Sequence, residues 1–140
     1  MVRTMAHSPA VLAGYLELSR AMKRSKLDRA LTERISLAVQ DELDCASCLA
    51  AHVAGARAIG LDDREISLAR DGTSSDPAIA ALIRFGVQVL TAPAEIGDAD
   101  IAALREHGYR DREIVEVVGI VALNLLTGAF NLVAGIEPDV

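Results

Sequence analysis

The chain is poor in aromatic residues, cysteine and positive charge. Its 140 residues include no tryptophan, two tyrosines, two phenylalanines and two cysteines, so aliphatic side chains must fill the core. Apolar residues make up 51% of the chain, which excludes a disordered polymer and predicts a globular protein with a sizeable core. Acidic side chains outnumber basic ones, and the net charge of −6 argues against a nucleic-acid partner.

Strand signals are also missing. No stretch alternates apolar and polar residues between turn signals, whereas helical periodicity recurs between capping residues. We therefore expect one all-α domain over residues 1–140, built from six to seven helices. Helices are expected from Pro9 to about Lys23, Asp28 to about Leu43, Asp44 to Gly60, Asp62 to about Asp71, Pro77 to Ala92, Asp98 to Glu106 and Asp111 to Ala134. The opening residues lack the apolar segment of a signal peptide, so we expect a cytoplasmic protein.

The last expected helix carries no charge from Val117 to Ala134, which is long enough for a membrane span. Glycine, asparagine and threonine within it, and the lack of a basic flank, favour a buried helix instead. We expect no membrane partner and predict that part of this helix is buried between subunits. Asn124 and Asn131 are seven residues apart, hence on one face, and are interpreted as paired core amides.

Both cysteines lie in one short stretch, where Cys45, Cys48 and His52 have the spacing C-x-x-C-x-x-x-H. Asp44 is expected to cap a helix that begins at this point. The three side chains then fall within an arc of roughly 60° on that helix. A helix N-terminus lowers the pKa of a thiol, a histidine can take the thiol proton, and two cysteines at this spacing can close a disulfide. The pattern predicts redox chemistry.

Other uses of two cysteines fit less well. A structural zinc site is a minor alternative, because the stretch lacks a second cysteine pair. Haem attachment is excluded because Leu49, not histidine, follows Cys48. A thioredoxin motif requires a preceding strand. We therefore expect no metal and no organic cofactor.

These residues resemble the alkylhydroperoxidase-D-like and carboxymuconolactone-decarboxylase-like proteins. In that family a glutamate stands twelve residues before the first cysteine, as Glu33 does here, and the C-x-x-C-x-x-x-H pattern follows. The resemblance continues through Gly60–Ile66 and through Asp98–Asp139. It implies the alkylhydroperoxidase-D-like helical fold and assembly into a homo-oligomer, a trimer or hexamer.

The resemblance also implies the roles of the site residues. Cys48 attacks a peroxide, Cys45 resolves the product to a disulfide, and His52 and Glu33 relay the proton. The expected partners are a small-molecule peroxide and a dithiol reductant, such as a lipoyl or thioredoxin-like protein. Helix position alone favours Cys45, which is nearer the helix start, as the better stabilised thiolate. Ser47 departs from the best-known alkylhydroperoxidase, which has a histidine there.

The main prediction is thus a thiol-dependent peroxidase or, more broadly, a dithiol-disulfide oxidoreductase. A carboxymuconolactone decarboxylase-type lyase is a second hypothesis. The lyase reaction does not require two cysteines. Its dicarboxylate substrate would be expected to bind basic side chains, and the cysteine helix offers only Arg57. A third hypothesis is a non-enzymatic redox switch that uses the same disulfide.

Overall fold

The computed structural model describes residues 1–138, and every regular element within them is helical. Eight α-helices and one 3₁₀ turn occur in this part of the chain: α1 (Val2–Met5), α2 (Pro9–Met22), α3 (Arg29–Glu42), α4 (Ala46–Ala58), α5 (Asp63–Arg70), α6 (Pro77–Thr91), η1 (Pro93–Glu95), α7 (Asp98–Glu106) and α8 (Asp111–Val133). The all-α prediction is confirmed, and the seven longer helices are the expected ones. The short elements α1 and η1 were not expected.

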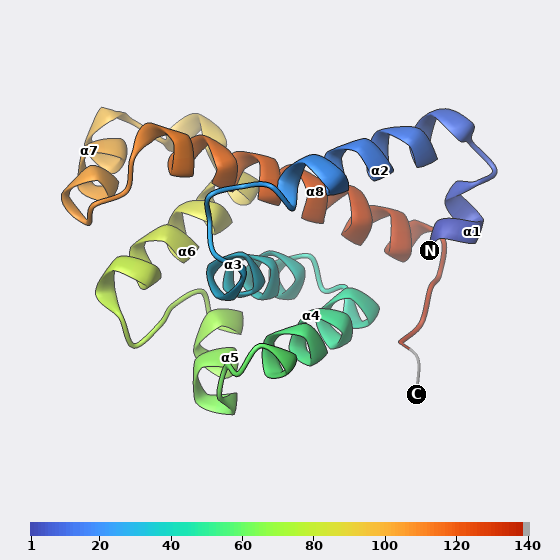
Figure 1. The fold of residues 1–140 in the computed structure, drawn as a ribbon, viewed down its shortest axis with the longest axis horizontal. Helices are drawn as coiled ribbons and strands as arrows, with labels where there is room; N and C mark the ends of the chain where they lie inside the picture. Colours follow the sequence, from blue (N-terminus) through green and yellow to red (C-terminus); the bar gives the residue numbers. More distant parts are fainter. Residues whose placement is uncertain (139–140) are drawn as a thin grey trace.

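Helix α3 is the centre of the fold. It is seen nearly end-on in the middle of Figure 1, with α4, α5, α6 and α8 packed around it. Its side chains Ile35, Leu37 and Val39 are completely buried. Asp28 begins the helix as predicted, because its carboxylate accepts a hydrogen bond from the Leu31 backbone N–H at 2.7 Å. Residues buried on α3 are therefore surrounded on nearly every side.

The buried apolar side chains of α3 to α8 form one cluster, as a single domain requires. Residue 139, the expected end of the family resemblance, and residue 140 lie outside the described residues. The domain boundary at the C-terminus stays a prediction.

Helix α8 crosses the molecule against α2, α3 and α6. By length and composition it is the one helix of residues 1–138 that could cross a membrane, and 33% of its most apolar window is buried. Its inner face, which includes Val117 and Val121, belongs to the core cluster. One face of α8 thus packs in the core, while a second apolar face is exposed at the surface of the molecule.

A polar contact fixes α8 against α3. The amide of Gln40 is fully buried, and its Nε2 donates to the backbone oxygen of Asn124 at 3.0 Å and to its Oδ1 at 2.9 Å. Asn124 Nδ2 donates in turn to Ser36 Oγ at 3.0 Å. Asn124 is therefore the paired core amide that the sequence predicts, and it sets the register of the two helices.

The start of α4 differs from the prediction. Asp44 does not cap this helix: it adopts a left-handed conformation with φ of 56°, and Cys45 occupies the N-cap position without a side-chain hydrogen bond. The reason is that α3 ends here, with the backbone N–H of Cys45 donating to the Gln40 oxygen at 3.1 Å. A left-handed residue just after a helix is a standard way to close it, so Asp44 ends α3 instead of starting α4.

Candidate functional site

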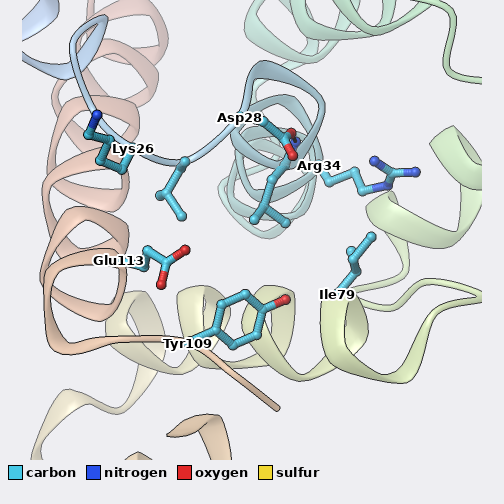
Figure 2. A pocket seen from close by; sticks show the side chains of 8 residues that line it. Lys26, Asp28, Arg34, Ile79, Tyr109 and Glu113 are labelled. Carbon is cyan, nitrogen blue, oxygen red and sulfur yellow. Dashed lines mark hydrogen bonds between the residues drawn. The ribbon is translucent and has the colours of Figure 1, made fainter.

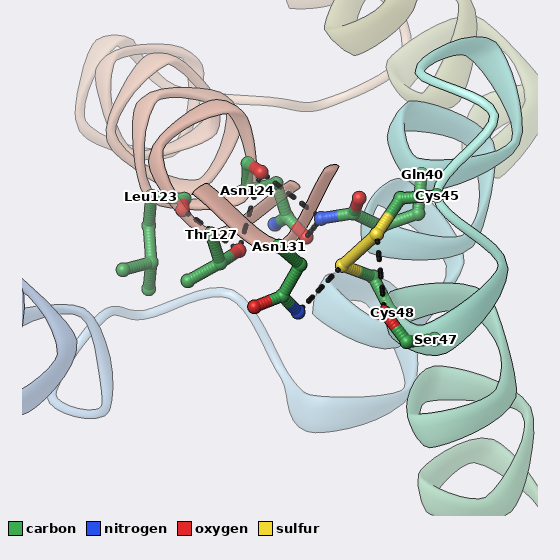
Figure 3. The surroundings of a disulfide bond; sticks show 8 residues. All are labelled: Gln40, Cys45, Ser47, Cys48, Leu123, Asn124, Thr127 and Asn131. Atoms are coloured by element: carbon green, nitrogen blue, oxygen red, sulfur yellow. Dashed lines mark hydrogen bonds between the residues drawn. A yellow bond between two sulfur atoms is a disulfide. The ribbon is translucent and has the colours of Figure 1, made fainter. Parts of the chain in front are cut away.

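The two cysteines lie where the end of α3 meets the start of α4. In the structure a disulfide joins Cys45 to Cys48, with their Cα atoms 5.4 Å apart (Figure 3). Cys45 is 1% exposed and Cys48 is 6% exposed. The predicted disulfide is therefore compatible with the helix geometry, and both sulfurs are shielded from bulk water.

The surroundings of the two sulfurs differ. Cys45 Sγ lies 3.6 Å from the hydroxyl of Ser47, its own neighbour in the helix. Cys48 Sγ accepts a hydrogen bond at 3.2 Å from Nδ2 of Asn131, which reaches it from α8. Cys48 also lines a cleft of about 970 Å³, whereas Cys45 is not among the lining residues. A small molecule that enters the cleft therefore meets Cys48 first.

His52 and Glu33 lie in the same cleft. The Nδ1 atom of His52 is 2.8 Å from Oε2 of Glu33, a direct contact between α4 and α3. The expected proximity of these two residues is thus present. Glu33 Oε1 also lies 3.7 Å from Nε of Arg29, one turn earlier on the same helix. The carboxylate fixes the imidazole and leaves its Nε2 available for proton exchange.

Gly55 makes room for this pair. A Cβ atom at position 55 would lie 3.1 Å from Glu33 Oε1, and the nearest atoms around it are all of Glu33. Glycine inside a helix costs about 1 kcal/mol relative to alanine. The sequence of this segment predicts only a helix, although a glycine one turn after the histidine is a signal of close approach.

The cleft walls come from both ends of the chain. Apolar and polar side chains of α2 and α8 line it, and so do residues just after α8. Examples are Tyr15, Met22, Leu123, Thr127 and Ile136. Arg57, the basic residue of the cysteine helix, is not among the lining residues and instead contacts Asp63 at 2.9 Å on the surface.

A second, smaller cavity has a volume of about 250 Å³ and shares the lining residue Leu27 with the cleft. Figure 2 shows Lys26, Tyr109 and Glu113 around it. Its walls mix both signs of charge, as with Lys26 and Glu113. Tyr109 donates its hydroxyl to the backbone oxygen of Ala78 at 2.9 Å. Burial, followed by the negative charge of nearby carboxylates, raises the pKa of Tyr109. The cavity holds no cysteine or histidine and offers a protonated phenol as a structural donor.

The structure bonds Cys45 to Cys48, brings His52 into contact with Glu33, and places Cys48, His52 and Glu33 in one cleft. The chemical roles of these four residues stay predictions. Sequence reasoning treated Asn131 as a core amide, and the structure instead places it on Cys48. Within residues 1–138 no group of three or more acidic, histidine or cysteine side chains is arranged to hold a metal ion.

Comparison with solved structures supports the fold. A peroxidase-related protein from Ralstonia eutropha JMP134, described as an alkylhydroperoxidase AhpD core, is 26% identical, with a TM-score of 0.88 over 97% of this chain and 74% of that one. A putative antioxidant defence protein from Agrobacterium tumefaciens is 23% identical, with a TM-score of 0.85 over 98% and 96% of the two chains. A debrominase in complex with 2,3,4-tribromopyrrole is 17% identical, with a TM-score of 0.82 over 99% and 75%. No curated protein sequence matched the chain significantly.

The fold is therefore AhpD-like, and the cysteine pair within it supports an enzyme with a redox role. The debrominase has the same fold, so the fold alone does not fix the reaction. The family model for carboxymuconolactone decarboxylases matches residues 9–92, which contain α2 to α6 and all four predicted site residues. The chain belongs to the carboxymuconolactone decarboxylase family.

Proposed function

We propose that the protein is a thiol-dependent peroxidase of the alkylhydroperoxidase type, in which Cys48 attacks and Cys45 resolves. The observation that carries this proposal is the position of Cys48: its sulfur is bonded to the buried Cys45 and also lines a cleft shared with the His52–Glu33 pair. A peroxide, a thiol and a proton carrier can therefore meet at one place.

In the first step His52 takes the Cys48 proton, with Glu33 stabilising the charged imidazole. The thiolate attacks the terminal oxygen of the hydroperoxide, so an S–O bond forms and the O–O bond breaks. The leaving alkoxide receives the proton from His52 and departs as an alcohol. Cys48 is left as a sulfenic acid, oxidised by two electrons.

In the second step the Cys45 thiolate attacks the Cys48 sulfur. The S–S bond forms, the S–O bond breaks, and the departing hydroxide leaves as water with the proton from Cys45. An external dithiol then reduces the disulfide by thiol–disulfide exchange and is itself oxidised to a disulfide. The net reaction converts a hydroperoxide and a dithiol to an alcohol, water and a disulfide, and it uses no bound cofactor.

A lyase acting on a dicarboxylate lactone is less well supported. Arg57 is not at the cleft. Two basic residues do line it, Lys23 and Arg29, but Arg29 lies 3.7 Å from Glu33. The proposed peroxide substrate needs no such basic clamp. We further propose that the protein is cytoplasmic and homo-oligomeric. The exposed apolar face of α8 supports the second of these proposals.

The test is catalytic turnover of cumene hydroperoxide, measured as peroxide loss with dihydrolipoamide as reductant and with thioredoxin in parallel. We expect many turnovers per protein with at least one dithiol, and none for Cys48→Ser. A single stoichiometric oxidation without turnover would instead favour the redox switch. Peroxide loss that is equal in Cys48→Ser and in the parent would contradict the proposal.

A further inference from the structure

Two asparagines lie on the same face of α8, and only one of them is accounted for by packing. Asn124 is 4% exposed, and both ends of its amide are hydrogen-bonded, to Gln40 and to Ser36. Asn131 is 8% exposed, and within residues 1–138 its Oδ1 atom has no hydrogen-bond partner. Its Nδ2 atom donates to Cys48 Sγ at 3.2 Å.

An amide buried in this way is unfavourable as a purely structural element. Leaving a buried carbonyl oxygen without a partner costs free energy, a cost that Gln40 Oε1 shares. Asn131 differs from Gln40 in its other end, because a neutral sulfur is a weak acceptor for the N–H. A leucine of similar size would fill the same space without this cost. The arrangement is explained if the sulfur becomes a strong acceptor during the reaction, which it does when Cys48 loses its proton.

We propose that Asn131 is a further catalytic residue, whose side-chain N–H stabilises the Cys48 thiolate. Figure 3 shows the nitrogen end of the amide directed at Cys48 and the oxygen end turned away from it. This orientation suits an anion, because the carbonyl oxygen would repel it. The inference rests on the proposed role of Cys48 as the attacking thiol.

The contact with Asn131 also distinguishes Cys48 from Cys45 as the better stabilised thiolate. A buried thiolate is destabilised unless donors or a helix N-terminus offset the loss of water. Both cysteines are at the start of α4, with Cys45 at the N-cap. In the described part of the chain, only Cys48 receives a donor from another helix, whereas Cys45 has the Ser47 hydroxyl at 3.6 Å. A hydrogen bond to a charged acceptor is about twice as strong as one between neutral groups, so Asn131 offsets the advantage of Cys45 in helix position.

The experiment measures the rate of Cys48 alkylation against pH in the Cys45→Ser protein, which leaves a single thiol. In this background we compare Asn131→Ala and Asn131→Asp with Thr127→Val. Thr127 lines the same cleft one turn earlier on α8, and its hydroxyl donates to the backbone oxygens of Leu123 and Asn124, not to sulfur.

We expect Asn131→Ala to move the alkylation midpoint up by about one pH unit, which is about tenfold slower reaction below the midpoint. Asn131→Asp should move it at least as far, because a carboxylate repels the thiolate. Thr127→Val should leave the midpoint in place. An unchanged midpoint in both Asn131 variants, or an equal shift in Thr127→Val, would overturn the proposal.

A second measurement needs no substitution at Asn131. In the Cys45→Ser protein, NMR resonances of the Asn131 side-chain amide should shift with the same pH midpoint as Cys48 alkylation, while those of Asn124 should not. If the Asn131 amide resonances do not change as Cys48 ionises, the proposal is refuted, even if the Asn131 variants fail to fold. Neither measurement uses peroxide, so a loss of peroxidase activity and a loss of the Asn131 effect are distinguishable.

Discussion

At the scale of single residues, the contact between Glu33 and His52 is the one that the proposed function assigns to activation of the thiol. The two side chains come from different helices and are 14% and 29% exposed. Glu33 sits beside Gly55, which leaves just enough room for its carboxylate. A carboxylate held in such a place is unfavourable without a partner. Its partners are His52 Nδ1 at 2.8 Å and Arg29 Nε at 3.7 Å.

Replacing Glu33 by glutamine tests this contact. The amide keeps the size of the side chain but removes the charge that favours a protonated imidazole, so His52 becomes a weaker proton acceptor. We expect the alkylation-versus-pH curve of Cys48 to move to higher pH and the rate near neutral pH to fall several-fold. Glu17→Gln, on an exposed pair with Arg20, is the control. Superimposable curves for Glu33→Gln and the parent would show that Glu33 has no part in thiol activation.

The sequence allowed most of these residues to be found, because their signals are local. Cys45, Cys48 and His52 follow a helical spacing, and Asp28 is an N-cap that needs no distant partner. Asn131 was missed because its role depends on a contact with Cys48, 83 residues earlier in the chain. Helical periodicity places an amide on a face but does not say which helix packs against that face.

Helix ends show further limits of local sequence patterns. Asp44 follows α3 and precedes α4, and an aspartate can either end the first helix or cap the second. It ends α3, in a left-handed conformation. Glu65 three residues after the Asp62 cap has the spacing of a capping box. Its carboxylate instead accepts hydrogen bonds from Ser74 and Ser75 in the following loop. Partners nine and ten residues along the chain thus replace the local one at Glu65, whereas at Asp44 the local closure of α3 decides.

At the scale of helices, the approach of α8 to α3 is set by Gly128. A Cβ atom there would lie 2.6 Å from Gln40 Oε1 and 2.8 Å from Leu43 Cδ1, both on the α3 side. No L-residue side chain fits without movement of the buried Gln40–Asn124 contact. The position of Asn131, one turn further along α8, depends on this same approach.

We therefore expect Gly128→Ala to destabilise the protein by about 1–3 kcal/mol through overpacking. Gly14→Ala is the matched control, because nothing lies within 4 Å of a Cβ atom at this position in α2. It should stabilise the protein by up to about 1 kcal/mol, as alanine favours helix. Urea unfolding compares the two. Equal stability of both variants would contradict the close packing of α8 on α3.

The outer face of α8 has a different pattern. Exposed apolar residues follow one another at alternating intervals of three and four: Val115, Val118, Ala122, Leu125, Ala129 and Leu132. Val115 is 68% exposed, and Leu132 is 48% exposed. This spacing is that of a helix–helix seam, and a stripe of this kind is unfavourable in water. It supports the prediction that the last helix packs between subunits.

A charged residue in this stripe should disrupt assembly. We expect Val118→Asp or Ala122→Asp to give smaller species or aggregates, because an unpaired charge buried at an interface costs several kcal/mol. The measurement is light scattering coupled to size exclusion. Val11→Asp, on the exposed face of α2, is the comparison. An unchanged molar mass in both α8 variants would place the interface elsewhere.

At the scale of the whole molecule, Glu65 joins three parts of the chain. It contacts Arg34 of α3 at 3.3 Å and holds the loop before α6 through Ser74 and Ser75. The pKa of Glu65 is lowered from 4.5 to about 2, chiefly by the hydrogen bond from the Ser75 side chain. Burial opposes this shift. Hydrogen bonds from Ser74 and from the Ser75 backbone, and then the charge of Arg34, add to the lowering.

This shift predicts how stability depends on acid. Because the pKa of Glu65 is lower in the folded protein, its ionised form stabilises the fold above about pH 4.5, and that contribution is lost as the pH falls towards about 2. We expect Glu65→Gln to cost on the order of 2 kcal/mol at neutral pH and to lose less stability than the parent on acidification. Thermal unfolding of the parent and of Glu65→Gln between neutral pH and pH 2 measures both effects. Stabilities that fall in parallel with pH in the two proteins would contradict the lowered pKa of Glu65.

The reaction itself is tested most directly by locating the first oxidation product. The Cys45→Ser protein cannot form the disulfide, so a single equivalent of cumene hydroperoxide should leave one oxygen atom on Cys48, trapped by dimedone and mapped by mass spectrometry. The Cys48→Ser protein should retain an unmodified Cys45 under the same treatment. Trapping at Cys45 in Cys48→Ser, or no trapped product in Cys45→Ser, would contradict the account of Cys48 as the attacking thiol.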